Sequence, residues 1–221
     1  SSESVAELVF AHLFGGVRFL HDSNRNMPLE GDTRFKELKK NYGGGRELRG
    51  KTLGIVGFGR IGREVAKIAL GCGMKVIASD REVGEADITL TFYDGQNITL
   101  KIKTAPIDKL IKHSDFISLH VPSQSGYLIG KEEISKMKEG VGIINAARGG
   151  ILDENALLEA IEDGKVSFAA LDVFENEPTP SIKILMHDKI SLTPHIGAAT
   201  NEAQDRIGLE LANQIISILV K

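Results

Sequence analysis

The feature that most constrains this chain is a glycine-rich turn that follows a short apolar run. Residues 52–56 read Thr-Leu-Gly-Ile-Val, and Gly57, Gly59 and Gly62 follow in a Gly-x-Gly-x-x-Gly spacing. We expect Gly57 to allow a tight turn, Gly59 to let a phosphate approach the backbone, and Gly62 to let a helix pack closely on the strand. A helix that begins in such a turn offers unpaired N–H groups and the positive end of its dipole to an anion. The pattern therefore predicts a strand, a turn and a helix that bind phosphate groups.

A second apolar run, residues 75–79, ends in Asp80. An acidic residue roughly 20 residues beyond such a turn accepts hydrogen bonds from the ribose hydroxyls of NAD. The glycine spacing by itself is weak evidence, because glycine-rich turns are common, and the alternative is a structural turn that binds no ligand. Here the strand, the helical pattern over residues 60–71 and the acid are all present, so NAD is the cofactor that we predict.

Apolar runs and helical patterns alternate along the rest of the chain. This alternation predicts an α/β fold, a doubly wound parallel sheet of the Rossmann type with helices on both faces. The predicted strands are residues 53–57, 75–79, 115–121, 141–145, 167–171 and 189–193. The predicted helices are residues 60–71, 106–113, 130–137, 153–163 and 200–219.

Two regions lie outside this alternation. A helix is predicted over residues 4–21, and a polar connecting segment with one short helix is predicted over residues 24–50. Residues 87–104 contain two alternating runs on either side of Asp94-Gly95. That pattern predicts a β-hairpin on the surface, between the second strand and the helix that follows it.

Charge and composition argue against several classes of partner. The 221 residues carry a formal net charge of −3, so nothing indicates nucleic acid or an anionic membrane as a partner. No apolar run approaches the roughly 20 residues that cross a bilayer, and no cluster of Cys and His has the spacing of a metal site. Cys72 is the one cysteine in the sequence, which excludes an intramolecular disulfide and fits a reducing compartment, so we expect a cytoplasmic location.

Three polar side chains follow predicted strands at the end where ligands bind in open parallel sheets. Arg148 follows residues 141–145 and could hold a carboxylate through two hydrogen bonds; the alternative is a surface arginine that caps a turn. Glu177 precedes a proline after the next strand, where the alternative is a turn residue. His195 lies between Pro194 and a turn of small residues, and it is a candidate acid–base group, although a histidine in a loop is often only solvated.

The three residues fit the roles of one reaction. Hydride transfer between a secondary alcohol and a nicotinamide needs a base for the hydroxyl proton and a group that orients the substrate. Glu177, hydrogen-bonded to the imidazole of His195, would fix its tautomer and hold its proton. Arg148 would orient the substrate and stabilise charge on the oxygen of the reacting carbon. These residues therefore predict an NAD-dependent dehydrogenase.

Four motifs together resemble a known family. GFGRIG (residues 57–62), NAARGGILDENALLEAIEDGK (145–165), LDVFENEP (171–178) and TPHIGAAT (193–200) occur in the order typical of the D-isomer-specific 2-hydroxyacid dehydrogenases. The resemblance runs from about residue 4 to the end of the chain. It implies an oxidoreductase that uses NAD to oxidise a small 2-hydroxy acid or reduce the matching 2-oxo acid.

The resemblance also assigns residues. It implies that the three polar residues at the strand ends are a catalytic triad, that Arg60 and Ile61 give backbone amides to the pyrophosphate, and that Asp172 approaches the nicotinamide carboxamide. The implied cofactor-binding residues are Gly57, Gly59, Arg60, Ile61, Gly62, Asp80, Val121, Pro122, Ala146, Ala147, Asp172 and Gly197. No metal is implied.

Proteins of this family have two domains, and the smaller, substrate-binding domain is built from both ends of the chain. The resemblance therefore implies an N-terminal crossover helix and connecting loop over residues 1–50, the NAD-binding domain over residues 51–199, and a C-terminal crossover helix over residues 200–221. We expect the substrate domain to lie outside this chain. The wide apolar arc of the N-terminal helix and the resemblance both indicate a homodimer or homotetramer.

The expected substrate is a small, phosphorylated 2-hydroxy acid. The basic groups that would bind a substrate phosphate lie mainly on the domain that we expect outside this chain, so another 2-hydroxy acid is the alternative. A further alternative, from a different class of protein, is an NADH-sensing corepressor that keeps the same three polar residues.

Overall fold

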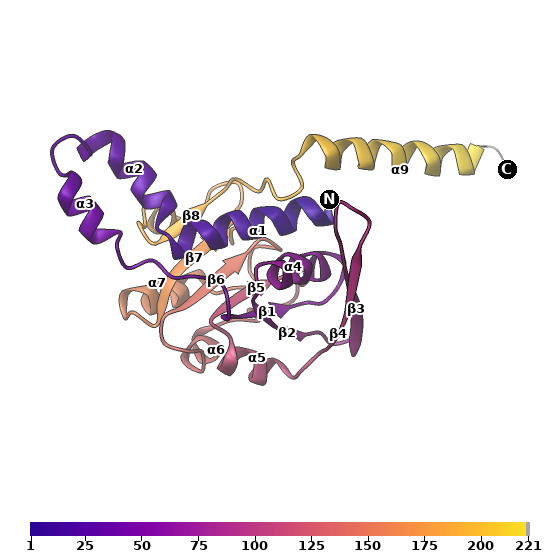
Figure 1. Ribbon diagram of the computed structural model, residues 1–221, viewed down its shortest axis with the longest axis horizontal. Coiled ribbons are helices and arrows are strands. Elements are labelled where there is room, and N and C mark those ends of the chain that lie inside the picture. Colours follow the sequence, from indigo (N-terminus) through magenta and orange to yellow (C-terminus); the bar gives the residue numbers. More distant parts are fainter. Residues whose placement is uncertain (220–221) are drawn as a thin grey trace.

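One parallel β-sheet forms the centre of the protein in the computed structural model, which describes residues 1–219 (Figure 1). Its strands lie in the order β2-β1-β5-β6-β7-β8, and each pair of neighbours is parallel. The strands are β1 (Thr52–Val56), β2 (Lys75–Ser79), β5 (Phe116–Leu119), β6 (Val141–Asn145), β7 (Val166–Leu171) and β8 (Ile190–Leu192). The predicted α/β fold with a Rossmann-type sheet is confirmed.

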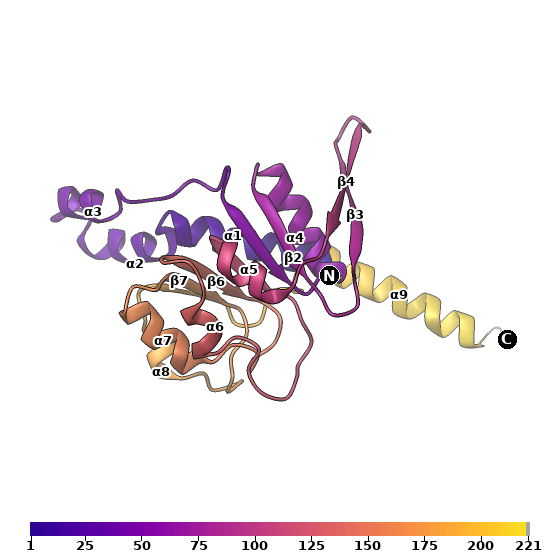
Figure 2. The same ribbon diagram turned by 90° about the horizontal axis from the view of Figure 1, so that it is seen from below.

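Helices cover both faces of this sheet. The helices on one face are α1 (Ser2–Val17) and α4 (Arg60–Gly71), and those on the other are α5 (Ile107–His113), α6 (Lys131–Ser135) and α7 (Glu154–Glu162) (Figures 1 and 2). Successive side chains of a strand point to opposite faces, so Ile143 packs with α5, α6 and α7, whereas Ile144 packs with α1 and α4. Because the central strands are buried on both faces, they read as continuous apolar runs in the sequence.

The N-terminal region differs from the prediction. α1 ends at Val17, and a second helix, α2 (Leu20–Glu30), begins after Phe19, whose φ of 56° interrupts the helix. The expected short helix is α3 (Phe35–Asn41). The prediction of one helix over residues 4–21 and an otherwise irregular segment is wrong about α2. Within α2 no residue is buried and Pro28 lies inside the helix, so neither an apolar stripe nor residue preference indicates a helix there.

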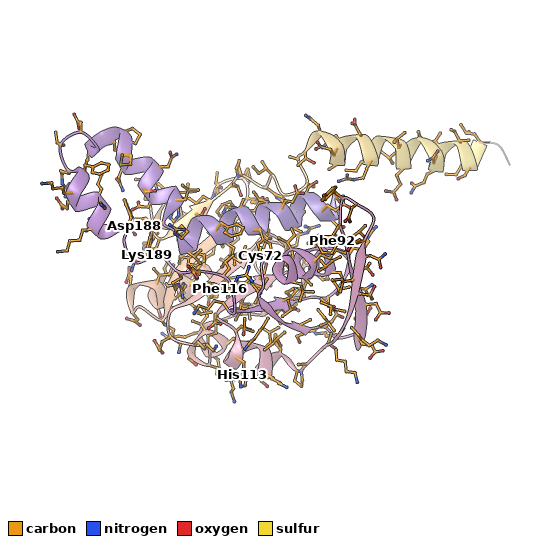
Figure 3. The ribbon with its side chains drawn as sticks, viewed as in Figure 1. Cys72, Phe92, His113, Phe116, Asp188 and Lys189 are labelled. Atoms are coloured by element: carbon orange, nitrogen blue, oxygen red, sulfur yellow. The ribbon has the colours of Figure 1, made fainter. Side chains whose placement is uncertain are left out.

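The predicted hairpin is confirmed. β3 (Glu85–Thr91) and β4 (Asn97–Lys103) form a separate antiparallel sheet, and Gly95 in its turn has a φ of 85°, which favours glycine. Ile88 on β3 is buried against the core beneath α1 and α4, whereas β4 is almost wholly exposed. The hairpin projects from the body of the protein (Figure 2), and Phe92 at the end of β3 is half exposed (Figure 3).

The last described helix, α9 (Asn201–Leu219), leads away from the sheet (Figures 1 and 2). Thr200 caps it, because its Oγ1 accepts a hydrogen bond from the N–H of Ala203 at 3.1 Å. Ala203 is the one buried residue in the described length of α9. The helix predicted at residues 200–219 is confirmed, and residues 220–221 of the expected C-terminal element lie outside the described residues. Over residues 1–219, no helix is long and apolar enough to cross a membrane.

The short α8 (Ile182–Leu185) lies between β7 and β8 and completes the element order. Every loop that follows a strand of the parallel sheet leaves from the same edge, because all six strands point the same way. The candidate residues after β1, β2, β5, β6, β7 and β8 are therefore gathered along one edge.

Candidate active site

The glycine turn at the end of β1 is set by close packing. Gly57 has a φ of 94°, and a Cβ at its position would lie 2.4 Å from the carbonyl oxygen of His120. A Cβ on Gly62 would lie 2.1 Å from the carbonyl oxygen of Gly57. Either contact would force backbone to move, so the fold itself requires glycine at both positions.

Gly59 differs from its neighbours, because a Cβ built on it meets no atom within 4 Å. Its φ of −74° suits any residue, so neither packing nor conformation requires glycine here. Gly59 instead lines a cavity of about 810 Å³ at the carboxyl ends of β1, β2 and β5, and it directly precedes the first residue of α4, Arg60. Because Gly59 has no side chain, the N-terminus of α4 is open to the cavity there, and this leaves room for a phosphate. The residues present fit a dinucleotide.

Asp80 follows β2 and lines the same cavity. Its carboxylate accepts hydrogen bonds from the backbone N–H groups of Phe58 at 2.6 Å, Glu82 at 2.9 Å and Val83 at 3.1 Å. Burial by itself would raise the pKa of Asp80, but these donors outweigh it and hold the pKa below its usual value. Asp80 is therefore a fixed negative charge beside the glycine turn.

All the predicted cofactor-binding residues lie along the same edge of the sheet, and some of them line the cavity. Those that line the cavity are Gly57, Gly59, Asp80, Val121 and Pro122. Those outside its lining are Arg60 and Ile61 in the first turn of α4, Gly62 behind the turn, Ala146 and Ala147 after β6, Asp172 after β7 and Gly197 beyond β8. Their contacts with the cofactor stay a prediction.

Arg148 lies in the loop after β6, and the last residue of that strand holds the loop. The side-chain amide of Asn145 donates to the carbonyl of Arg148 at 3.0 Å, and its oxygen accepts from the N–H of Ala147 at 3.1 Å. The Arg148 guanidinium donates to the carbonyl of Ala147 at 2.6 Å and is exposed. A Cβ on the next residue, Gly149, would lie 1.8 Å from the carbonyl oxygen of Phe174, so this loop lies directly against the loop after β7.

Glu177 and His195 are in direct contact. Nδ1 of His195 lies 2.9 Å from Oε2 of Glu177, whose other oxygen accepts a hydrogen bond from the N–H of Phe174 at 3.0 Å. The bond to His195 is the main reason that the pKa of Glu177 lies below its usual value, and the charge of Arg148 adds to this effect. A second cavity, of about 440 Å³, lies beside Glu177 and His195. Glu177 and His195 thus form a hydrogen-bonded pair from two strand ends, and Arg148, from a third, acts on Glu177 through its charge without contacting either side chain in the part of the chain that the structure describes.

The turn that carries Glu177 is also tied to α7. The N–H of Glu175 donates to Oε1 of Glu154 at 2.8 Å, and the N–H of Glu154 donates to Oε1 of Glu175 at 2.9 Å. Glu154 is buried, and burial raises its pKa. Together with the close approach at Gly149, these reciprocal bonds fix the turn relative to the Arg148 loop.

Asp172 is buried after β7, and its carboxylate holds the loop that carries His195. Oδ1 accepts from the hydroxyl of Thr193 at 2.6 Å and from the N–H of Ile196 at 2.8 Å, and Oδ2 accepts from the N–H of Gly197 at 2.9 Å. The sequence suggests only a cofactor contact for Asp172, so this anchoring of residues on both sides of His195 is new. The sequence assigns no role to Thr193, and its place in the TPHIGAAT motif is the only signal for it.

His120 lines the larger cavity, and the sequence gives no reason to select it. Its Nε2 lies 2.8 Å from Oγ of Ser118, while its buried Nδ1 has no hydrogen-bond partner in the part of the chain that the structure describes. Burial lowers the pKa of His120 to about 3, so the ring is neutral at physiological pH. The backbone of His120 thus shapes the glycine turn, and its ring stays uncharged.

A parallel sheet with a glycine turn before α4 and a fixed acid after β2 defines a dinucleotide-binding domain of the Rossmann class. The family described as "D-isomer specific 2-hydroxyacid dehydrogenase, NAD binding domain" matches residues 10–197. The chain belongs to this family of NAD-dependent dehydrogenases and contains its NAD-binding domain.

Relatives of known name carry the same region. The chain is 46% identical to the hydroxypyruvate reductase of Thermotoga maritima over 99% of its own length and 67% of that protein. It is 40% identical to the D-3-phosphoglycerate dehydrogenase of Methanocaldococcus jannaschii over 99% of its own length, but it spans only 40% of that protein. The crystal structure of D-lactate dehydrogenase from Aquifex aeolicus, complexed with NAD and lactic acid, is 33% identical and superimposes with a TM-score of 0.75 over 99% of this chain and 67% of that one.

Proposed function

We propose that the protein that carries this chain is a D-3-phosphoglycerate dehydrogenase, which oxidises 3-phospho-D-glycerate to 3-phosphohydroxypyruvate in L-serine biosynthesis. The main support for oxidation of an alcohol is the 2.9 Å contact between His195 and Glu177. This contact lies at the same edge of the sheet as the glycine turn. An acid–base pair beside a dinucleotide site is the arrangement that this oxidation needs.

The chemistry divides between the cofactor and the side chains. NAD, when bound, supplies the nicotinamide carbon that takes the hydride from C2 of the substrate. His195 accepts the proton of the 2-hydroxyl at Nε2, and Glu177 accepts the Nδ1–H and stabilises the imidazolium that forms. Loss of one proton and one hydride leaves the 2-oxo acid. In the reverse direction, His195 returns the proton to the carbonyl oxygen.

Arg148 orients the substrate in this proposal. Its guanidinium is exposed at the edge of the sheet and offers paired N–H donors that match a carboxylate. Its charge, close enough to lower the pKa of Glu177, also stabilises negative charge on the 2-oxygen during hydride transfer. The residues that would hold NAD are Gly59, Asp80 and the first turn of α4.

Hydroxypyruvate reductase is the second candidate, because the relative of that name is 46% identical to this chain. The two candidates differ in whether the substrate carries a phosphate. Glyoxylate and D-lactate are further substrates to include, since the family contains enzymes named for each. A corepressor that senses NADH would bind the cofactor and show no turnover with any of these acids.

Steady-state kinetics of the whole protein test the proposal. We expect kcat/KM for 3-phosphohydroxypyruvate with NADH to exceed that for hydroxypyruvate, glyoxylate and pyruvate, and we expect His195→Ala to lower kcat by about 10²–10⁴-fold with little change in NADH affinity. A preference for hydroxypyruvate would establish the second candidate instead. Equal turnover in wild type and His195→Ala would refute the assigned mechanism.

We also propose that the protein is a cytoplasmic homodimer or homotetramer. The support lies in α1, α2 and α3, where Phe14 is 47% exposed, Leu29 is 75% exposed and Phe35 is 56% exposed. Large apolar side chains exposed on neighbouring helices are typical of an interface. Light scattering that finds a monomer at micromolar concentration would contradict this assembly.

A further inference from the structure

His12, a buried histidine on α1, is joined to the strand that leads to the catalytic loop. The residue is only 5% exposed. Its Nδ1 lies 2.8 Å from Oγ of Ser191 on β8, and its Nε2 lies 2.9 Å from Oγ1 of Thr193, just after that strand. A helix from the start of the chain thus reaches the segment that holds His195.

The chemistry of the partners fixes the direction of these hydrogen bonds. The hydroxyl of Thr193 donates to Oδ1 of Asp172 at 2.6 Å, because a carboxylate only accepts. The Thr193 oxygen therefore accepts from Nε2–H of His12, and Nδ1 of the neutral ring accepts from the hydroxyl of Ser191. Burial lowers the pKa of His12, although the charge of Asp172 opposes that shift, and a neutral ring agrees with this direction.

The chain of hydrogen bonds ends at the two residues that follow His195. Asp172 accepts from the N–H groups of Ile196 and Gly197, which follow His195 directly. His195 itself has a φ of 57°, in the left-handed region that non-glycine residues rarely adopt, so its backbone needs support from its neighbours. The bonds from His12 through Thr193 to Asp172 supply that support.

α1 also touches the loop by packing. A Cβ on Gly197 would lie 3.3 Å from a methyl carbon of Val5, and the hydroxyls of Ser4 and Thr200 lie 2.9 Å apart. α1 therefore contacts the segment from β8 to Thr200 at two places, near its first turn at Ser4 and Val5 and about two turns further along at His12. The hydrogen bonds of His12 lie at one end of this contact, and those of Ser4 lie at the other.

We propose that His12 is a positioning residue for His195, acting through Thr193 and Asp172. His12 holds the Thr193 hydroxyl in the orientation that directs its proton to Asp172, and Asp172 then holds the backbone on which the imidazole of His195 depends. The effect on turnover rests on the proposed function, whereas the effect on the loop does not.

Paired substitutions at Thr193 separate the hydrogen bond from packing. Thr193→Val keeps the shape and removes the hydroxyl, while Thr193→Ser keeps the hydroxyl. The loss of a hydrogen bond to a charged group changes the equilibrium constant that depends on it by about 10–100-fold. In the whole protein we expect Thr193→Val to lower kcat by about 10–100-fold with KM values within about 3-fold, and Thr193→Ser to recover most of the loss. His113→Leu, at an exposed residue that ends α5 (Figure 3), is the control and keeps wild-type kcat.

Native-state hydrogen exchange gives the readout that does not need activity. We expect Thr193→Val and His12→Leu to speed exchange of the Ile196 and Gly197 amides by about 10–100-fold, with the amides of β1 unchanged. Unchanged exchange at both amides in Thr193→Val would overturn the proposal, whatever the activity. A wild type that turns over no 2-hydroxy acid would refute the proposed function, and the exchange measurement would still decide the positioning role.

Discussion

The half-buried ring of His120, whose Nδ1 is buried without a hydrogen-bond partner among the described residues, makes a quantitative prediction about acid stability. The unfolded chain binds a proton on this histidine near the ordinary histidine pKa of 6.5, whereas burial lowers the pKa in the folded protein to about 3. The unfolded state therefore binds more protons between these values. By linkage, the stability that the neutral ring allows is fully present above pH 6.5 and is lost as the pH falls toward 3.

The size of the loss follows from the difference in proton binding. Each unit of pKa difference corresponds to about 1.4 kcal/mol. At about pH 5 the unfolded histidine is almost fully protonated and the folded one is almost fully neutral. The free energy of unfolding should therefore fall by about 2 kcal/mol between about pH 7.5 and pH 5 because of this residue.

Urea unfolding of wild type and His120→Gln at both pH values measures this contribution. Glutamine cannot titrate in this range and keeps a polar group near Ser118. The pH-dependent loss should be about 2 kcal/mol smaller in His120→Gln, since the other titrating groups, His12 among them, are common to both proteins and cancel. His113→Gln, an exposed histidine, should keep the wild-type loss. An equal loss in wild type and His120→Gln would refute the argument that the ring is held neutral by burial.

Three further outcomes are expected. NADP should bind at least about 10-fold more weakly than NAD, because the carboxylate of Asp80 repels a 2′-phosphate; calorimetric titration with comparable affinities would contradict this. Arg148→Lys should lower kcat/KM for the 2-hydroxy acid by about 10–100-fold, because an ammonium cannot reproduce the paired donors, and near-normal kinetics would remove Arg148 from carboxylate binding. Gly149→Ala should lower the melting temperature and kcat together, since its Cβ would lie 1.8 Å from the carbonyl oxygen of Phe174; a variant with wild-type melting and turnover would show that the two loops are not held in contact.

Much of the fold could be predicted from the sequence, because burial leaves a pattern of apolar residues. The strands of the central sheet are covered on both faces, and α4 presents one apolar stripe, so continuous runs and helical periodicity identify them. α2 could not be predicted, since no residue within Leu20–Glu30 is buried and Pro28 argues against a helix. The hairpin of β3 and β4 could be predicted from its alternation and its Asp94-Gly95 turn.

The site divides in the same way. The residue types at the strand ends, Arg148, Glu177 and His195, could be selected because the topology of a parallel sheet gathers them at one edge. The network behind them could not be predicted, because His12 and Thr193 are 181 positions apart and carry no shared pattern. Nor does the sequence show that Asp172 uses its carboxylate oxygens to hold the loop of His195.

From the place of β1 between β2 and β5 we expect a definite order of folding in this sheet. Leu53 pairs with Val76 on one side and with Phe116 on the other, so the second pairing closes a much longer stretch of chain. Pairing between strands far apart in the sequence is slow, because the chain loses the entropy of closing a long loop before the contacts form. The β3–β4 hairpin pairs strands that are close in the sequence, so it can form sooner. The turn at Gly57 packs against the carbonyl of His120, just beyond the end of β5. During refolding we therefore expect affinity for the dinucleotide to develop after the hairpin forms and after β5 docks.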